Sequence, residues 1–295
     1  MTASVAGATA PRARLARTAR DAAVTLPFFG YLTVFLFLPT VIVIVGAFRN
    51  RDGGFTLDGV SKLFTPATGQ IFLTTAWLSL ASALIGAVVG AVAAYALSTV
   101  PLTSPLRRVY TAVSSVLAQF GGVMLAFAFI SVLGKNGNFT RLMADAFGAT
   151  VPGDFLTSVP GLIVVYCYFQ IPLMIIVFLP AVDGLRQEWR DATENLGGST
   201  WTFWSRVAGP ILLPSFLGSF LLLFANAFSA YATAAALISQ RTIIVPMAIE
   251  GAIRNENDTG MDSYAQALAA GMIVVIAVVM ALYAALQRRA GRWTR

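Results

Sequence analysis

Polar side chains within long uncharged stretches are the residues of this sequence best suited to chemistry. Polar groups are expensive to place in hydrocarbon, so they usually face protein or water. Amides and hydroxyls bind a polar solute through hydrogen bonds, which makes these side chains candidates for lining a pathway across a membrane. The alternative is that they bond between helices and only stabilise the packing. The candidates are Gln119, Gln170, Asn226, Ser229 and Tyr231.

The composition excludes most other chemistry. The sequence has no histidine and a single cysteine, Cys167, so the commonest metal ligand and the usual general base are missing. We therefore predict no metal site and no cofactor. A phosphate-binding loop needs Gly, four residues and then Gly-Lys-Ser/Thr. Residues 134–136, Gly-Lys-Asn, have neither the upstream glycine nor the hydroxyl residue. The chain is thus predicted to be non-catalytic and to have no nucleotide-binding site of its own.

Hydropathy places the chain in a membrane. It is 57% hydrophobic and 11% charged, with a mean hydropathy of +0.76, whereas a soluble domain has about 25% charged residues. Six windows without Asp, Glu, Lys or Arg exceed the roughly 20 residues that a helix needs to cross a bilayer. We predict an all-α integral membrane protein with six transmembrane helices. The windows are 22–48, 63–106 (one helix, about 71–99, after a turn at 64–69), 109–134, 155–182, 207–240 and 263–287.

The distribution of positive charge orients these helices. With both termini in the cytosol, the inner segments hold about twice as many Lys and Arg residues as the outer segments, which is the positive-inside asymmetry. Residues 1–21 and 288–295 are then basic cytoplasmic tails around a membrane domain of residues 22–287. The net charge of +7 is explained without a nucleic-acid partner.

A polar segment, residues 184–206, separates the fourth and fifth windows. Apolar residues recur along its first half at intervals of four, three and four, which predicts an amphipathic helix. Gly197 is expected to end this helix, and Ser199 or Thr200 to cap a second short one. The alternative is that the amphipathic helix lies on the membrane surface, where such helices are strongly basic. The charges of this segment are nearly balanced, which favours binding in a groove of a protein. The apolar residues are Leu185, Trp189, Ala192 and Leu196.

The same segment resembles a known family. The pattern Asp191-Ala192-Thr193, three residues, Gly197, nine residues, Val207, two residues, Pro210 is similar to the EAA signature of bacterial ABC importer permeases. That signature is Glu-Ala-Ala, three residues, Gly, nine residues, Ile, one residue, Leu-Pro. The departures are Asp for Glu, Thr for the second Ala, Val for Ile and Gly209 for Leu. The resemblance covers about residues 70–285 and implies a MetI-like fold in a bacterial plasma membrane.

The resemblance also implies a mechanism and a set of partners. The loop would form a coupling helix seated in a cleft of a cytosolic ATPase, with Asp191, Ala192 and Thr193 in the cleft and Gly197 at the turn. Leu196 and Trp201 flank the turn as apolar anchors. The implied partners are two cytosolic ABC ATPases, a second homologous permease or second copy of this chain, an extracytoplasmic substrate-binding protein and membrane lipid.

Three further stretches bear on the cargo. Residues 224–237 resemble the corresponding span of permeases for polyamines, ferric iron, thiamine and aminoethylphosphonate, and residues 119–122 and 134–140 point the same way. We therefore expect a polyamine such as spermidine or putrescine, or a related small solute. The outer segment 241–262 is expected to contact the binding protein.

Two other functional classes are compatible with a polytopic membrane protein. One is a secondary transporter or channel without an ATPase, and the other is a membrane scaffold. Coupling to protons usually needs ionisable groups within the membrane. All 13 acidic residues lie outside the six windows, which disfavours the first alternative. Co-purification with an ATPase subunit separates these classes from an importer permease.

Overall fold

The computed structural model describes residues 25–50, 53–148, 152–238, 243–255 and 260–290. For residues 286–290 it describes the backbone alone. These ranges are almost entirely helical and contain no β-strand, only an isolated antiparallel bridge between Arg49 and Phe55. The predicted basic tail 1–21 lies outside the described residues. The predicted C-terminal tail begins inside the last helix, which continues to Ala290.

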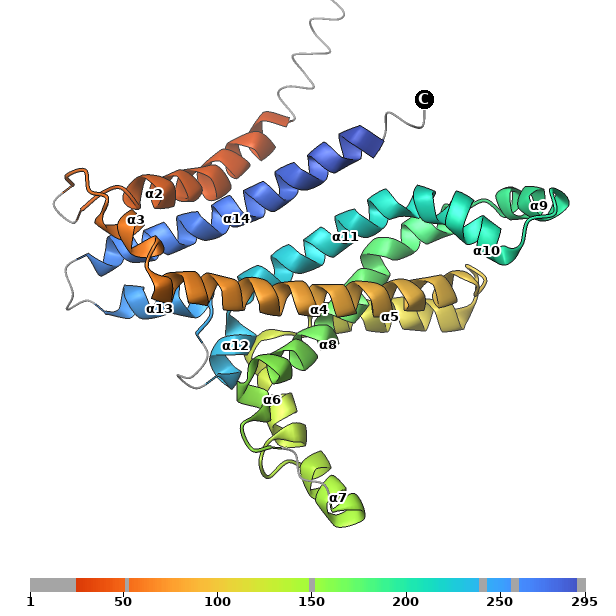
Figure 1. Ribbon diagram of the computed structural model, residues 1–295, viewed down its shortest axis with the longest axis horizontal. Coiled ribbons are helices and arrows are strands. Elements are labelled where there is room, and N and C mark those ends of the chain that lie inside the picture. The colour runs from red at the N-terminus through yellow and green to blue at the C-terminus, as the bar shows by residue number, and fades with distance from the viewer. Residues whose placement is uncertain (1–24, 51–52, 149–151, 239–242, 256–259, 291–295) are drawn as a thin grey trace, which may run out of the picture.

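The helices are labelled in chain order, with α for α-helices and η for short helices of another type (Figure 1). Of these, η1 and η3 are π-helices and η2 is a 3₁₀ helix. The elements are η1 Thr33–Phe37, α2 Leu38–Gly46, α3 Asp58–Leu63, α4 Pro66–Ser98, α5 Pro105–Gln119, α6 Gly122–Leu133, α7 Asn138–Phe147, η2 Phe155–Thr157, α8 Val159–Asp183, α9 Gln187–Asn195, α10 Thr200–Phe203, η3 Trp204–Ala208, α11 Gly209–Ser229, α12 Ala232–Leu237, α13 Val245–Arg254 and α14 Met261–Ala290.

Five helical segments of the described chain are long and apolar enough to cross a membrane, namely 25–46, α4, α8, 200–229 and α14. The prediction of an all-α membrane protein is confirmed. A sixth span exists if the bent pair formed by α5 and residues 122–147 crosses as one unit. The prediction of one transmembrane helix in the window 109–134 needs correction. The chain bends by 99° between Gln119 and Gly122, so this window is not one continuous helix. The predicted turn at 64–69 is also shorter, since α4 begins at Pro66, capped by Thr65.

The centre of the bundle is formed by α4, α8 and α11. Helix α8 packs along α4, and α5 and α11 also contact α8. Gly86 and Gly90 are buried where α4 meets α8. A Cβ atom on Gly90 would lie 2.5 Å from the Cβ of Met174, so only glycine allows this approach. On the other side of the molecule, α14 lies beside α2, with α3 and α13 packed against it (Figure 1).

Candidate functional site

Two interrupted helices face each other inside the bundle. The chain breaks between α5 and α6 and again between α11 and α12. At the first break Gly122 has a φ of +72°, a conformation that glycine adopts without strain. Its N–H donates to the Oγ1 atom of Thr233 at 2.8 Å, which joins the two breaks. Interrupted helices leave backbone groups unpaired, and inside a membrane protein they occur where protein or a cavity satisfies those groups.

A cavity of about 340 Å³ lies at this junction. Its walls combine amide, hydroxyl and backbone groups with two aromatic rings, and they contain no carboxylate or cationic side chain. The carbonyl ends of α5 and α11 and the N–H ends of α6 and α12 meet here, and helix ends carry partial charges of opposite sign. Such a site suits a polar or cationic solute held by hydrogen bonds. The lining residues are Ala118, Gln119, Gly121, Gly122, Phe169, Asn226, Ser229, Ala230, Tyr231, Ala232 and Thr233.

Four of the five predicted pathway residues line this one cavity. Gln119 comes from α5, while Asn226, Ser229 and Tyr231 come from the end of α11 and the break after it, more than 100 positions later. Ser229 donates its hydroxyl to the carbonyl of Ala225 at 2.9 Å, so its oxygen can still accept a hydrogen bond. The structure thus brings these four side chains together, and their role in a pathway stays a prediction.

Gln170 lies apart from the other four. It is completely buried where α8 meets α4 and α11. Its Nε2 atom donates to the carbonyl oxygen of Leu223 at 3.1 Å, while its Oε1 atom has no hydrogen-bond partner among the described residues. A Cβ atom on Gly86 would lie 2.7 Å from the Cβ of Gln170, so the residue is tightly enclosed. These contacts match the alternative of an interhelical hydrogen bond.

The predicted coupling segment folds as two short helices around a sharp turn. Helix α9 ends at Asn195, Gly197 adopts a left-handed φ of +75°, and Ser199 caps α10 through a capping box with Thr202. On α9, Arg190 pairs with Glu194 one helical turn later, at 3.3 Å. The residues of the predicted apolar face do not all point the same way. Leu185 precedes α9 and packs against the core, whereas Leu196 is exposed.

The residues assigned to coupling lie on and beside this turn. Asp191 and Ala192 are exposed on α9, and Asp191 accepts a hydrogen bond from Gln187 at 3.2 Å. Thr193 donates its hydroxyl to the Trp189 carbonyl at 2.7 Å and is half-buried.

Leu196 and Trp201, on either side of Gly197, are 89% and 79% exposed. Two large apolar side chains beside one polar turn form an exposed patch, the kind of feature that marks an interaction site.

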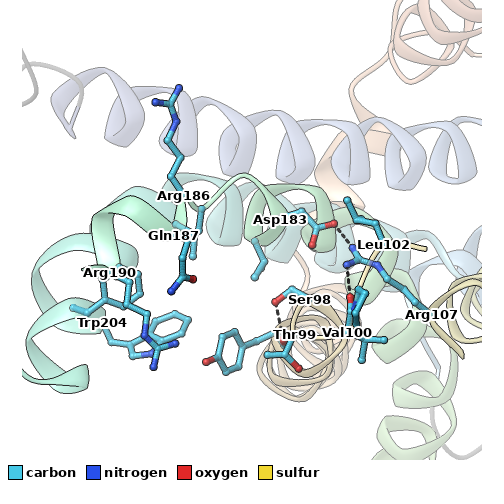
Figure 2. Close-up of a pocket in the computed structure, with 15 residues that line it drawn as sticks. Ser98, Thr99, Val100, Leu102, Arg107, Asp183, Arg186, Gln187, Arg190 and Trp204 are labelled. Atoms are coloured by element: carbon cyan, nitrogen blue, oxygen red, sulfur yellow. Dashed lines mark hydrogen bonds and ion pairs between the residues drawn. The ribbon is translucent and has the colours of Figure 1, made fainter. Parts of the chain in front are cut away.

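One ion pair near this segment was not predicted from the sequence. Arg107, in the first turn of α5, donates to the carboxylate of Asp183 at the end of α8 and to the Val100 carbonyl at 3.0 Å (Figure 2). Both residues stand at edges of uncharged windows, which is the only sequence signal they carry. The pair borders a pocket of about 390 Å³ with α9 on one side and the end of α4 on the other.

Helices long and apolar enough to cross a membrane, with interruptions around a polar cavity, are typical of a multi-pass membrane transport protein. The sequence profile of the family described as binding-protein-dependent transport system inner membrane component matches residues 142–292. The chain belongs to this family. It is therefore a permease subunit of a binding-protein-dependent ABC importer, located in a bacterial inner membrane.

Similar proteins come from several transport systems. The chain is 23% identical to the spermidine/putrescine transport system permease protein PotB of Haemophilus influenzae, over 86% of this chain and 90% of that protein. It is 25% identical to the sulfate transport system permease protein CysW of Synechocystis, over 85% of this chain and 87% of that protein. A solved bacterial ABC transporter involved in the import of alginate has the same fold, with a TM-score of 0.73, 18% identity and coverage of 96% of this chain and all of that one.

The hydrogen bond between the two breaks can be tested by replacing Thr233. The change Thr233→Val keeps the side-chain shape but removes the acceptor of the Gly122 N–H, and an unsatisfied buried donor costs about 1–3 kcal/mol. We expect a lower midpoint in thermal unfolding of the purified protein. Thr233→Ser, which keeps the hydroxyl, is the matched control and should unfold close to the wild type. Equal midpoints for all three proteins would show that this bond does not hold the junction.

Proposed function

We propose that this chain forms half of a translocation pore and couples ATP hydrolysis by two separate cytosolic ATPases to solute uptake. The observation that carries the proposal is the exposed turn between α9 and α10, with Leu196 and Trp201 on either side of Gly197. The excess of Lys and Arg that the sequence puts on one side of the membrane supports a cytosolic position for this turn. A second permease, either homologous or a copy of this chain, would complete the pore.

The turn is continuous with a membrane-crossing helix. The helical segment 200–229 runs without interruption from the turn to the cavity, where it ends at Ser229. Within it, η3 precedes Pro210, which has no N–H to donate to the preceding turn, and a π-helical turn accommodates such a gap. A movement imposed on Trp201 by closing ATPases would thus reach Asn226 and Ser229 through one helix.

A polyamine-like solute is the cargo that we favour. The similarity to PotB supports it, although CysW and an alginate transporter are also similar. The cavity supports it physically, because amide oxygens of Gln119 and Asn226, helix carbonyl ends and the ring of Phe169 attract ammonium groups. In such a system an extracytoplasmic binding protein would deliver the solute, and residues 241–262, which include α13, are the expected docking surface.

Coupling can be tested at Gly197. The change Gly197→Val forces a β-branched residue into a left-handed conformation and should displace Leu196 and Trp201, although nothing crowds the site itself. We expect the reconstituted complex to hydrolyse ATP but to lose most of its solute uptake. Gly148→Val is the matched control, because Gly148 also ends a helix with positive φ, at +64°, and is also uncrowded. Intact uptake in the Gly197 variant would refute the coupling role.

Cargo can be tested by transport into proteoliposomes. The chain, its partner permease, the ATPases and the binding protein encoded with them are reconstituted together, and labelled spermidine, putrescine and sulfate are supplied in turn. We expect ATP-dependent accumulation of the two polyamines and none of sulfate. Replacing Asn226 with Ala should lower polyamine uptake while leaving basal ATP hydrolysis in place. Accumulation of sulfate alone would contradict the proposed cargo but not the importer function.

A further inference from the structure

We propose that the ion pair between Arg107 and Asp183 transmits movement of the coupling segment to the cavity through α5. The inference rests on the proposed function, since it assumes that an ATPase moves the turn around Gly197. It adds a second route beside the helix 200–229. Neither residue is among those that line the cavity, so the two act as positioning residues rather than as solute ligands.

The position of Asp183 ties it to the coupling segment. It is the last residue of α8, and α9 begins only four positions later at Gln187. Gly184 and Leu185 are the first residues of the short connection between them, and Leu185 packs against the core. A displacement of α9 therefore acts on the end of α8 at Asp183.

The position of Arg107 ties it to the cavity. It lies in the first turn of α5, whose last residue, Gln119, lines the cavity. Helix α5 has 15 residues, a length of about 22 Å at 1.5 Å per residue, and it packs against α8. A helix of this length moves as a rod, so a shift at Arg107 changes the position of Gln119.

The pair between Arg107 and Asp183 differs from the local ion pairs found among the described residues. The pairs Arg186–Glu188, Arg190–Glu194 and Arg254–Glu250 join residues two or four positions apart at the surface, where ion pairs contribute little. Arg107 is 7% exposed, while the side chain of Asp183, which lies 76 positions away in the sequence, is 28% exposed. A buried charge of this kind depends strongly on its partner. A pocket of about 390 Å³ lies between α9 and the end of α4, so the two helices are not closely packed against each other there (Figure 2).

The test measures the accessibility of position 119, the last residue of α5, in two nucleotide states. In a Cys167→Ala background, Gln119→Cys gives a single cysteine at the cavity. The complete complex with its ATPases is reconstituted, and labelling by a membrane-impermeant maleimide is compared without nucleotide and after trapping with ATP and vanadate. We expect a several-fold change in labelling rate with the native pair. Asp183→Asn, which removes the charge at constant size, should abolish this change while ATP hydrolysis continues.

Two further variants separate transmission from mere stability. Arg108→Gln removes the neighbouring charge, which is exposed in the same turn of α5, and should keep the nucleotide-dependent change. The exchange Arg107→Asp with Asp183→Arg should restore part of the change that Asp183→Asn loses. A full nucleotide-dependent change in Asp183→Asn would overturn this inference alone. A wild-type chain that binds no ATPase would overturn the proposed function and this inference with it.

Discussion

The need to satisfy every backbone N–H and C=O group inside hydrocarbon is the constraint on which this structure depends. Unbroken helices satisfy the groups internally, which explains why helical segments account for the membrane spans. Where a helix starts inside the bundle, a side chain from a distant helix supplies the acceptor. Thr233 accepts from Gly122 at the start of α6, and Thr75 accepts from Val245 at the start of α13. The interruptions are therefore held in place rather than loose.

This constraint also links the cavity to the exposed turn. A helix that cannot bend without losing hydrogen bonds transmits displacement along its length. The segment 200–229 connects Trp201 to the cavity, and α5 connects Arg107 to the same cavity. Both routes begin near α9 and both end at polar side chains. This geometry supports the proposal that force applied at the exposed turn changes the shape of the cavity.

The sequence predicted the features that depend on local pattern. Five of the six uncharged windows coincide with helices long and apolar enough to cross a membrane. Helical spacing with Gly197 and Ser199 located α9, the turn and the cap of α10. Features that depend on distant contacts were not predictable. The 99° bend requires Thr233 to satisfy Gly122 from 111 positions away, and Gln170 stands apart because α4, α8 and α11 enclose it. The pairing of Arg107 with Asp183 likewise has no local signal.

The central claim is that the turn around Gly197 is seated in an ATPase, and contact at Trp201 tests it most directly. A photo-crosslinking amino acid is placed at position 201, where the side chain is 79% exposed, and cells producing the whole transport system are illuminated. We expect the main protein adduct to be the cytosolic ATPase subunit, formed more weakly when Gly197 is replaced by Val. Adducts formed only with an extracytoplasmic protein or with lipid, and none with the ATPase, would contradict the claim.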